Sequence, residues 1–338
     1  MTVPGESPGP KKRALAQCPE RGEDTPTRGR CQAVTARTIC HNQFQRGGET
    51  TVEWEHHTGM QTADTTIRLI DLSFADGARQ LAISEAIMRF TGRGESPPTI
   101  RLYSWSEPVV ILGVGQPAGD LNLALCRERG YRVLRRIGGG TAVYHDAEEV
   151  SIDMIVPAGH RLGPTDVHRG YDLFSQMLSL ALRQQGIEAE TVTVERARAM
   201  SLDESMRPVC FASVSPFEFL HDGRKLDGIC QIRRKDAIAY QAAIYNRFPV
   251  DPIIDVINHE TGDLREHRRS QLERFATDLS TARGESADYR ELQRSVASAA
   301  SECFDATVTV GELTPDELEE TEQLISEKYA SDDWTYRR

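Results

Sequence analysis

The chain has 338 residues, of which 39% are hydrophobic and 27% charged, so it is long enough to bury a substantial core. Its formal net charge of −11 argues against bulk binding to nucleic acid, which requires a basic surface. No run approaches the ~18 apolar residues that a membrane span needs, and the N-terminus lacks the apolar core of a signal peptide. We therefore expect a cytoplasmic protein without a membrane or nucleic-acid partner.

Residues 1–62 are rich in Gly, Pro, Thr, Arg and Glu and carry few periodic apolar positions. This composition predicts a disordered N-terminal extension. Met60 stands just before the first regular element, so the natural protein could start there. The intact mass of the natural protein tests this hypothesis, because a mass that includes residues 1–59 excludes it.

The seven cysteines are odd in number and irregularly spaced, which is typical of reduced intracellular thiols. Zinc would need a cluster with C-x-x-C spacing, and the N-terminal candidates lack such a pair. These candidates are Cys18, Cys31, Cys40 and His41. We expect no metal site.

From Thr65 onward the apolar patterns become regular. Strand patterns occupy seven stretches: 65–72, 99–105, 108–114, 131–136, 141–146, 151–156 and 190–194. Helical spacing occupies three stretches: 76–90 with Asp76 as N-cap, 121–130 closed by Gly130, and 166–185 ending at Gly186.

The second half of the chain contains a sequence pattern that is typical of a β-hairpin. Asp222-Gly223 and a second turn at 234–236 divide residues 217–245 into three antiparallel strands. After about Val250 the patterns are helical, including 288–304 and 314–330, and Thr314 with Glu317 forms a capping-box pattern. Strands without regular helix alternation predict an α+β fold, with a mixed, largely antiparallel sheet flanked by helices.

A glycine-rich loop lies between two of these strands. Gly138, Gly139 and Gly140 follow Arg135-Arg136, and such a loop can hold a phosphate or a carbonyl oxygen on its N–H groups. It matches neither the Walker loop nor the dinucleotide fingerprint. A flexible turn with solvated arginines explains it equally well. For His145, beyond the loop, structural hydrogen bonding is the commoner role.

The pattern R-R-x-x-G-G-x-A-V-x-H-D resembles the lipoyl-substrate loop of the biotin/lipoate protein ligase family, which includes the lipoate–protein ligase A and cysteine-dependent octanoyltransferase branches. Further segments resemble that family's first helix, second and third strands, lysine segment and chain ending: 80–90, 100–116, 223–235 and 326–338. The resemblance runs from about residue 65 to 338. It implies a catalytic domain at 63–260, with 261–338 as a helical C-terminal part of the same domain.

The resemblance also implies an acyl pocket. Its substrate-binding residues would be Arg135, Arg136, Gly138, Gly139, Gly140, Thr141, Ala142, Val143, Tyr144 and His145. Cys210 and Lys225 would be catalytic, and their separation resembles that of the cysteine-dependent octanoyltransferases. There a nearby ammonium would lower the thiol pKa, and the thiolate would carry the acyl group to a target lysine. Taken alone, Cys210 could be an inert buried thiol and Lys225 a solvated hairpin lysine.

Several positions depart from the pattern of that branch. Val214 replaces a proline, Ile229-Cys230 replaces the middle of a G-S-A-Q segment, and Gln241-Ala242 stands where a His-Gly pair is expected. Cys230 is a rival thiol, although its place suggests a small filling residue. The changes at Gln241-Ala242 put the details of the acyl pocket or of target docking in doubt.

The resulting hypothesis is an enzyme that moves an octanoyl or lipoyl group onto a lysine of a lipoyl carrier domain, without a tightly bound cofactor. The carrier would be a 2-oxoacid dehydrogenase E2 subunit or glycine cleavage H protein, and the donor an acyl-carrier protein. Two alternatives stay open: a lipoate–protein ligase that forms an acyl-adenylate with ATP and Mg²⁺, and a non-catalytic acyl- or carrier-binding subunit. A biotin ligase is less favoured.

A group of basic residues near the second hairpin has two readings. Its members are Arg224, Lys225, Arg233, Arg234 and Lys235. Together they could attract an acidic carrier domain, or they could be the solvated charges of an ordinary hairpin.

Overall fold

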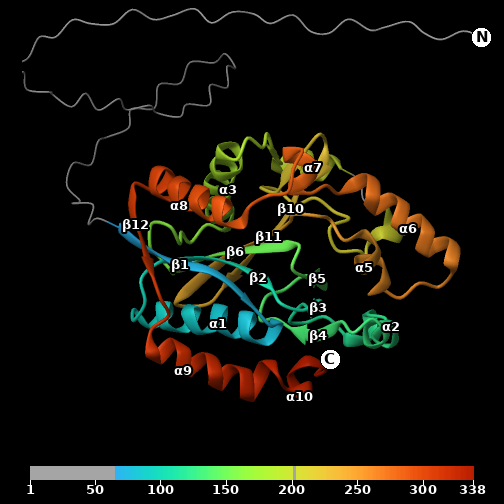
Figure 1. Ribbon diagram of the computed structural model, residues 1–338, viewed down its shortest axis with the longest axis horizontal. Coiled ribbons are helices and arrows are strands. Elements are labelled where there is room, and N and C mark those ends of the chain that lie inside the picture. The colour runs from blue at the N-terminus through green and yellow to red at the C-terminus, as the bar shows by residue number, and fades with distance from the viewer. Residues whose placement is uncertain (1–64, 201–202) are drawn as a thin grey trace, which may run out of the picture. The chain divides into compact units, whose positions relative to one another are not determined.

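The computed structural model describes residues 65–200 and 203–338 (Figure 1). The expected disordered extension at 1–62, the alternative start at Met60 and the residues considered for zinc all lie outside these ranges.

The core of the fold is a six-stranded sheet with the order β10-β11-β6-β2-β1-β12. Its strands are β1 Thr65–Ala75, β2 Thr99–Trp105, β6 Glu149–Pro157, β10 Asp227–Arg233, β11 Ala237–Tyr245 and β12 Ala306–Gly311. The pairs β2–β6, β6–β11 and β10–β11 are antiparallel, whereas β1–β2 and β1–β12 are parallel. The prediction of a mixed, largely antiparallel sheet is therefore confirmed.

Two three-stranded sheets flank the large one. One contains β3 Val109–Leu112, β4 Arg132–Arg135 and β5 Val143–His145; the other contains β7 Glu190–Thr191, β8 Phe219–His221 and β9 Arg224–Lys225. The prediction of three strands in 217–245 was wrong, because the Asp222-Gly223 hairpin belongs to the small sheet. After Leu226 the chain enters the large sheet as β10 and β11, so the segment contains four strands.

Four helices cover the two faces of the large sheet. In Figure 1, α1 Gly77–Arg93 and α9 Pro315–Leu324 lie on one side, and α3 Val167–Gln184 and α8 Tyr289–Phe304 on the other. The predicted N-terminal caps of α1 and α9 are confirmed: Asp76 accepts hydrogen bonds at the start of α1, and Thr314 and Glu317 form a capping box for α9. Asp166, for which no cap was predicted, caps α3 in the same way.

Shorter helices complete the chain: α2 Leu123–Glu128, α4 Val194–Ala199, α5 Val250–Asp255, α6 Gly262–Phe275, α7 Leu279–Arg283 and α10 Asp332–Thr335. The expected strand at 190–194 is shorter than predicted, because Thr193 caps α4 and ends the extended segment. The part of the chain at 261–338, which was expected to be helical, also contains the strand β12. The alternating residues of β12 form an edge strand parallel to β1.

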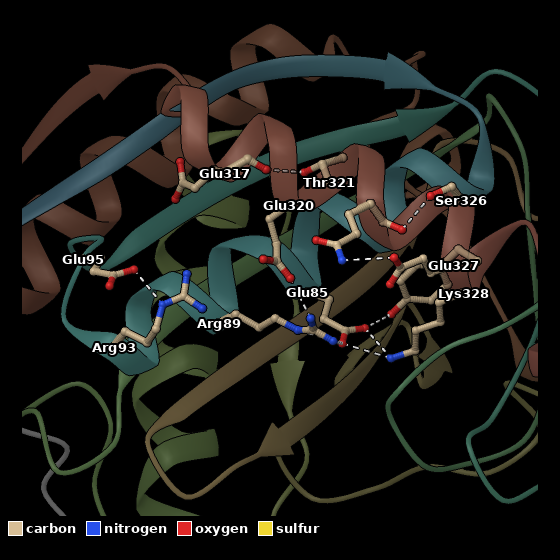
Figure 2. Close-up of polar contacts among 12 residues, drawn as sticks. Glu85, Arg89, Arg93, Glu95, Glu317, Glu320, Thr321, Ser326, Glu327 and Lys328 are labelled. Carbon is tan, nitrogen blue, oxygen red and sulfur yellow. Dashed lines mark hydrogen bonds and ion pairs between the residues drawn. The ribbon is translucent and has the colours of Figure 1, made fainter.

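The end of the chain is attached to α1 through a buried carboxylate. Figure 2 shows Glu85 on α1 beside Arg89 and Lys328. The Nζ atom of Lys328 lies 2.9 and 2.7 Å from the two Glu85 oxygens, and the Tyr329 hydroxyl donates to Glu85 at 2.5 Å. These bonds fix a π-helical turn, Ile325–Tyr329, that follows α9.

A second buried ion pair connects β1 to the capping box of α9. Arg68 donates to the Glu317 oxygens at 2.8 and 2.6 Å, and Ser96 donates to Glu317 at 2.6 Å. Burial alone would raise the pKa of Glu317, but the hydrogen bonds from Arg68 and Ser96 outweigh burial and hold it below the usual range. Glu317 is therefore ionised at neutral pH and depends on Arg68 for compensation.

Arg68→Met is expected to lower the free energy of unfolding by about 3–5 kcal/mol, because Glu317 would be left buried without its cation. Arg79→Met is the matched control: its exposed pair with Glu322, on the same helix α9, should contribute less than about 1 kcal/mol. Because the folded-state pKa of Glu317 is lowered, this stabilisation is complete above the ordinary carboxyl pKa and is lost as the pH falls through the folded-state pKa. Denaturant titrations at neutral and acidic pH measure both effects, and an equal loss in the two variants would contradict the prediction.

Candidate functional site

A cavity of about 300 Å³ opens where the glycine loop, the 207–218 segment and strands β9–β11 meet. Much of its wall is apolar and comes from Leu81, Trp105, Ile111, Val143, Val209, Phe211, Ile229, Ala242 and Ala243. The polar groups of the wall include Arg136, Thr141, His145, Cys210, Glu218, Lys225, Cys230 and Gln241. An apolar pocket with a few converging polar groups is typical of a small-molecule site.

Eight of the twelve predicted site residues line this cavity: Arg136, Gly139, Gly140, Thr141, Val143, His145, Cys210 and Lys225. Ala142 and Tyr144 instead pack into a neighbouring apolar cluster, because successive side chains of β5 alternate between its two sides. Gly138 lies against Ile232 of β10. The role of each residue in binding or catalysis stays a prediction.

Arg135 also lies outside the cavity lining, where it joins three parts of the chain. Its fully buried guanidinium donates to the main-chain carbonyls of Gly113, Gln116 and Thr335 at 2.7, 2.6 and 2.8 Å. Trp334 returns a hydrogen bond to the Arg135 carbonyl at 2.8 Å. The geometry therefore gives Arg135 a structural role at the base of the glycine loop.

The glycine loop has its shape because backbone approaches backbone closely there. Gly140 has a positive φ of 88°, and a Cβ on Gly113 would come within 1.9 Å of the Gly140 carbonyl oxygen. Arg136 holds the loop by donating to the carbonyls of Gly139, Thr141 and Ile111, the last two at 2.9 and 2.8 Å. Arg136 thus shapes the loop and also forms part of the cavity wall.

Lys225 is a buried ion-pair partner. Its Nζ lies 2.8 Å from Oε2 of Glu218 and donates to the Ser213 carbonyl at 2.7 Å. The two charged side chains are only 6% and 4% exposed. The Ser215 N–H donates to Glu218 at 2.7 Å, so the 213–218 segment folds around the pair. Glu218 was not among the predicted site residues.

A second carboxyl group lies next to this pair. Asp227 is fully buried, and the Phe219 N–H donates to it at 2.7 Å. Burial raises the pKa of Asp227 well above its usual range, and the charge of Glu218 raises it further. Both effects favour the neutral form of Asp227, whereas Glu218 lies in direct contact with the ammonium of Lys225.

The environment of Cys210 corrects one expectation. Burial raises the pKa of the thiol, and this effect exceeds the lowering by Lys225 and Arg136. We expected the ammonium of Lys225 to favour the thiolate. It does lower the pKa of Cys210, but burial outweighs that effect and favours the neutral thiol.

The residue after Cys210 has unusual backbone geometry. Phe211 has a positive φ of 67°, a conformation that costs free energy for any residue other than glycine. Its ring lies against those of Tyr245 and Phe248, with centroids 5.3 and 5.5 Å away. A Cβ on Gly228 would come within 3.1 Å of the same ring. The packing of the Phe211 ring thus fixes the backbone that carries Cys210.

Two further polar groups form the opposite part of the wall. Gln241 donates to buried Asp153 at 2.9 Å, while its carbonyl oxygen lies 3.6 Å from the sulfur of Cys230. His145 contacts Glu149 at 2.6 Å, and its ring is stacked 4.5 Å from that of Trp105. Glu149 therefore fixes the orientation of the imidazole. Gln241, which replaces an expected histidine, bridges a buried carboxylate and a thiol.

The basic residues near the second hairpin do not form one face. Lys225 is buried, and Arg224 precedes β10 while Arg234 follows it, so the two arginines lie at opposite ends of that strand. Arg233 donates to the Pro164 carbonyl at 2.7 Å. The arrangement does not support the prediction of a single basic docking patch.

The two cavity thiols should react with iodoacetamide at different pH values. Burial raises the pKa of Cys230 to about 11, and Cys210 should titrate above the ordinary thiol range. Lys225→Met should move the Cys210 midpoint higher still, because a cation that opposes burial is lost. Cys230 is the internal control, since its main opposing cation is Arg136. Peptide mass spectrometry across pH measures both midpoints; a Cys210 midpoint below the ordinary range would contradict the prediction.

The described residues hold neither a membrane-spanning helix nor a metal-binding cluster. None of the helices between 65 and 338 that the structure describes is long and apolar enough to cross a membrane. Within the same described ranges, no group of three or more His, Cys, Asp or Glu side chains is arranged to hold a metal ion.

Comparison with known proteins places these residues in context. The family model of the lipoyl protein ligase A/B catalytic domain matches residues 76–301. Octanoyltransferase LipM of Kyrpidia tusciae is 31% identical over 274 residues, which cover 81% of this chain and 99% of the relative. Octanoyltransferase LipM of Symbiobacterium thermophilum is 29% identical over 276 residues, covering 81% and 100%.

Solved structures agree with the fold. A bipartite lipoate protein ligase of Thermoplasma acidophilum, studied with its E2 lipoyl domain, superimposes with a TM-score of 0.67 at 19% identity and covers 80% of this chain and 96% of its own. A lipoate–protein ligase A bound with ATP gives a TM-score of 0.63 at 20% identity, covering 80% and 98%. At these identities the similarity shows the fold alone.

Proposed function

This chain belongs to the lipoyl protein ligase A/B catalytic domain family, and from that premise we propose that it transfers an octanoyl group to a lysine of a lipoyl carrier domain through a thioester on Cys210. The observation that carries the proposal is the meeting of Cys210 and Lys225 at one apolar cavity. Two octanoyltransferases align with 81% of the chain, which supports the same activity.

The first half-reaction loads the enzyme. The sulfur of Cys210 attacks the carbonyl carbon of an octanoyl thioester, whose carbon–sulfur bond then breaks. The proton of Cys210 leaves with the donor thiol, so the exchange of one thioester for another is balanced. The ammonium of Lys225 lies on the same cavity wall and would stabilise the negative charge that develops on the carbonyl oxygen.

The second half-reaction transfers the octanoyl group from Cys210 to the target lysine. The amine of the target lysine attacks the Cys210 thioester, an amide bond forms, and the sulfur of Cys210 departs. The released sulfur takes the proton that the amine loses, so the step is balanced and the free thiol is regenerated.

The donor in this proposal is an octanoyl acyl-carrier protein. The acceptor is the lipoyl domain of a 2-oxoacid dehydrogenase E2 subunit or the glycine cleavage H protein. A structural neighbour was studied with an E2 lipoyl domain, which supports an acceptor of that class. The proposal requires no tightly bound cofactor, and a reduced catalytic thiol is consistent with the cytoplasm.

ATP-dependent lipoate ligation in the same cavity is the second candidate. Its support is the fold shared with a ligase bound with ATP, at 20% identity. A non-catalytic binding subunit is not favoured, because the relatives that match most of the chain are enzymes.

Mass spectrometry of the protein incubated with octanoyl acyl-carrier protein tests the proposal. We expect an octanoyl adduct on the peptide that contains Cys210, which disappears when a lipoyl domain is added. An absent adduct, together with transfer that needs free acid and ATP, would favour the ligase candidate instead.

A further inference from the structure

Cys210 lies on the boundary between two cavities. Besides the apolar cavity already described, a second one of about 500 Å³ is lined by Cys210, Thr141 and Arg207, which also line the first. We propose that the second cavity receives the pantetheine-type arm of the acyl donor, while the first holds the acyl chain. This inference rests on the proposed thioester chemistry at Cys210.

The geometry of the reaction requires two compartments at this thiol. In the intermediate, the carbonyl carbon is bonded to Cys210, to the acyl chain and to the sulfur of the leaving thiol. The chain and the leaving group extend in different directions from that carbon. If the acyl chain occupies the apolar cavity, the second cavity offers the donor arm a path that also begins at Cys210.

The wall of the second cavity combines apolar and polar side chains, which suits a flexible arm that carries amide groups. Its apolar part comes from Leu121, Ala142, Tyr144, Ile253, Val256 and Ile257, and its charged members are Asp120, Arg207, Glu260 and Arg268. Among the described residues, the buried side-chain oxygen of Gln116 has no hydrogen-bond partner, and Gln116 lines this cavity. An amide N–H of the arm would supply the missing donor to that oxygen.

Hydrogen bonds hold part of this wall in place. Asn258 donates to the Gly119 carbonyl at 2.9 Å, and Arg268 donates to the carbonyls of Ser205 and Asn258 at 2.7 and 3.0 Å. These bonds connect the 116–121 stretch, the residues after α5, and helix α6. The segments around the cavity are thus joined to one another without using the side-chain oxygen of Gln116.

Gly119 allows a direct test. A Cβ added there meets no heavy atom within 4 Å, so a tryptophan at this position would fill open space at the cavity wall. Gly262 is the matched control. It also has no heavy atom within 4 Å of an added Cβ, and at the start of α6 it belongs to neither cavity lining.

The experiment measures the rate at which Cys210 is acylated by two small donors, octanoyl-pantetheine and octanoyl-N-acetylcysteamine, which lacks the outer half of the arm. Gly119→Trp should slow acylation by octanoyl-pantetheine roughly ten-fold or more, while the truncated donor changes by less than about two-fold. Gly262→Trp should change neither rate. Gln116→Leu, as a second variant, should raise the KM for octanoyl-pantetheine with little effect on kcat.

The outcomes separate this inference from the proposed function. An equal loss with both donors, or no loss with either, would overturn the assignment of the second cavity to the donor arm. If acylation is normal in both variants but unloading by a lipoyl domain is slowed, the cavity belongs to the acceptor lysine and the inference is also overturned. If wild-type Cys210 is acylated by neither donor nor by octanoyl acyl-carrier protein, the proposed thioester chemistry itself fails.

Discussion

Cys210→Ala is expected to reduce octanoyl transfer roughly 10³-fold or more, because the thioester route has no other nucleophile in the right place. Overall stability should change little, since Cys210 is only partly buried and contributes a small side chain. Octanoylation of a lipoyl domain by the purified protein, followed by gel shift or mass spectrometry, measures the loss.

The matched control is Cys230→Ala. Cys230 lines the same cavity, but its pKa is raised to about 11 and its sulfur contacts Gln241. We expect this variant to retain transfer within a few-fold. Full transfer by Cys210→Ala with lipoate and ATP would exclude the thioester route. If Cys230→Ala is inactive while Cys210→Ala is active, the nucleophile is Cys230 and not Cys210.

Lys225→Met is expected to damage both activity and stability. Loss of the ammonium removes charge stabilisation at the carbonyl oxygen, which we expect to lower kcat by about 10²–10³-fold. It also leaves Glu218 buried without a cation, which should lower the free energy of unfolding by about 3–5 kcal/mol. Single-turnover transfer and denaturant unfolding measure the two effects separately.

The double variant Lys225→Met/Glu218→Gln separates the two roles. Removing both charges should recover much of the lost stability, because the unpaired carboxylate is gone. Activity should stay low, since the cation is still missing. If the double variant regains activity together with stability, Lys225 has a purely structural role.

Much of this site follows from sequence patterns alone. The glycine loop between two strands and the Cys210–Lys225 spacing are local features, and the structure brings both to one cavity. The capping box of α9 and the turn at Asp222-Gly223 are local too, which explains why these predictions are confirmed.

Other features depend on three-dimensional contacts that a local pattern does not contain. Tyr144 lies one residue from cavity-lining Val143, and only the pairing of β5 decides which side each of them faces. Likewise, β12 becomes a strand because β1 offers it a parallel edge far away in sequence. Burial of the Cys210 thiol outweighs the lowering of its pKa by Lys225 and Arg136, and spacing along the chain gives no measure of that burial.

The neutral state of Cys210 also affects how the enzyme meets oxidants. Peroxide attacks the thiolate of cysteine, and the raised pKa of Cys210 keeps the thiolate fraction low at pH 7. If Cys210 carries the acyl group as proposed, it resists conversion to sulfenic acid between turnovers. Its sensitivity to oxidation is then confined to the steps in which the sulfur carries negative charge.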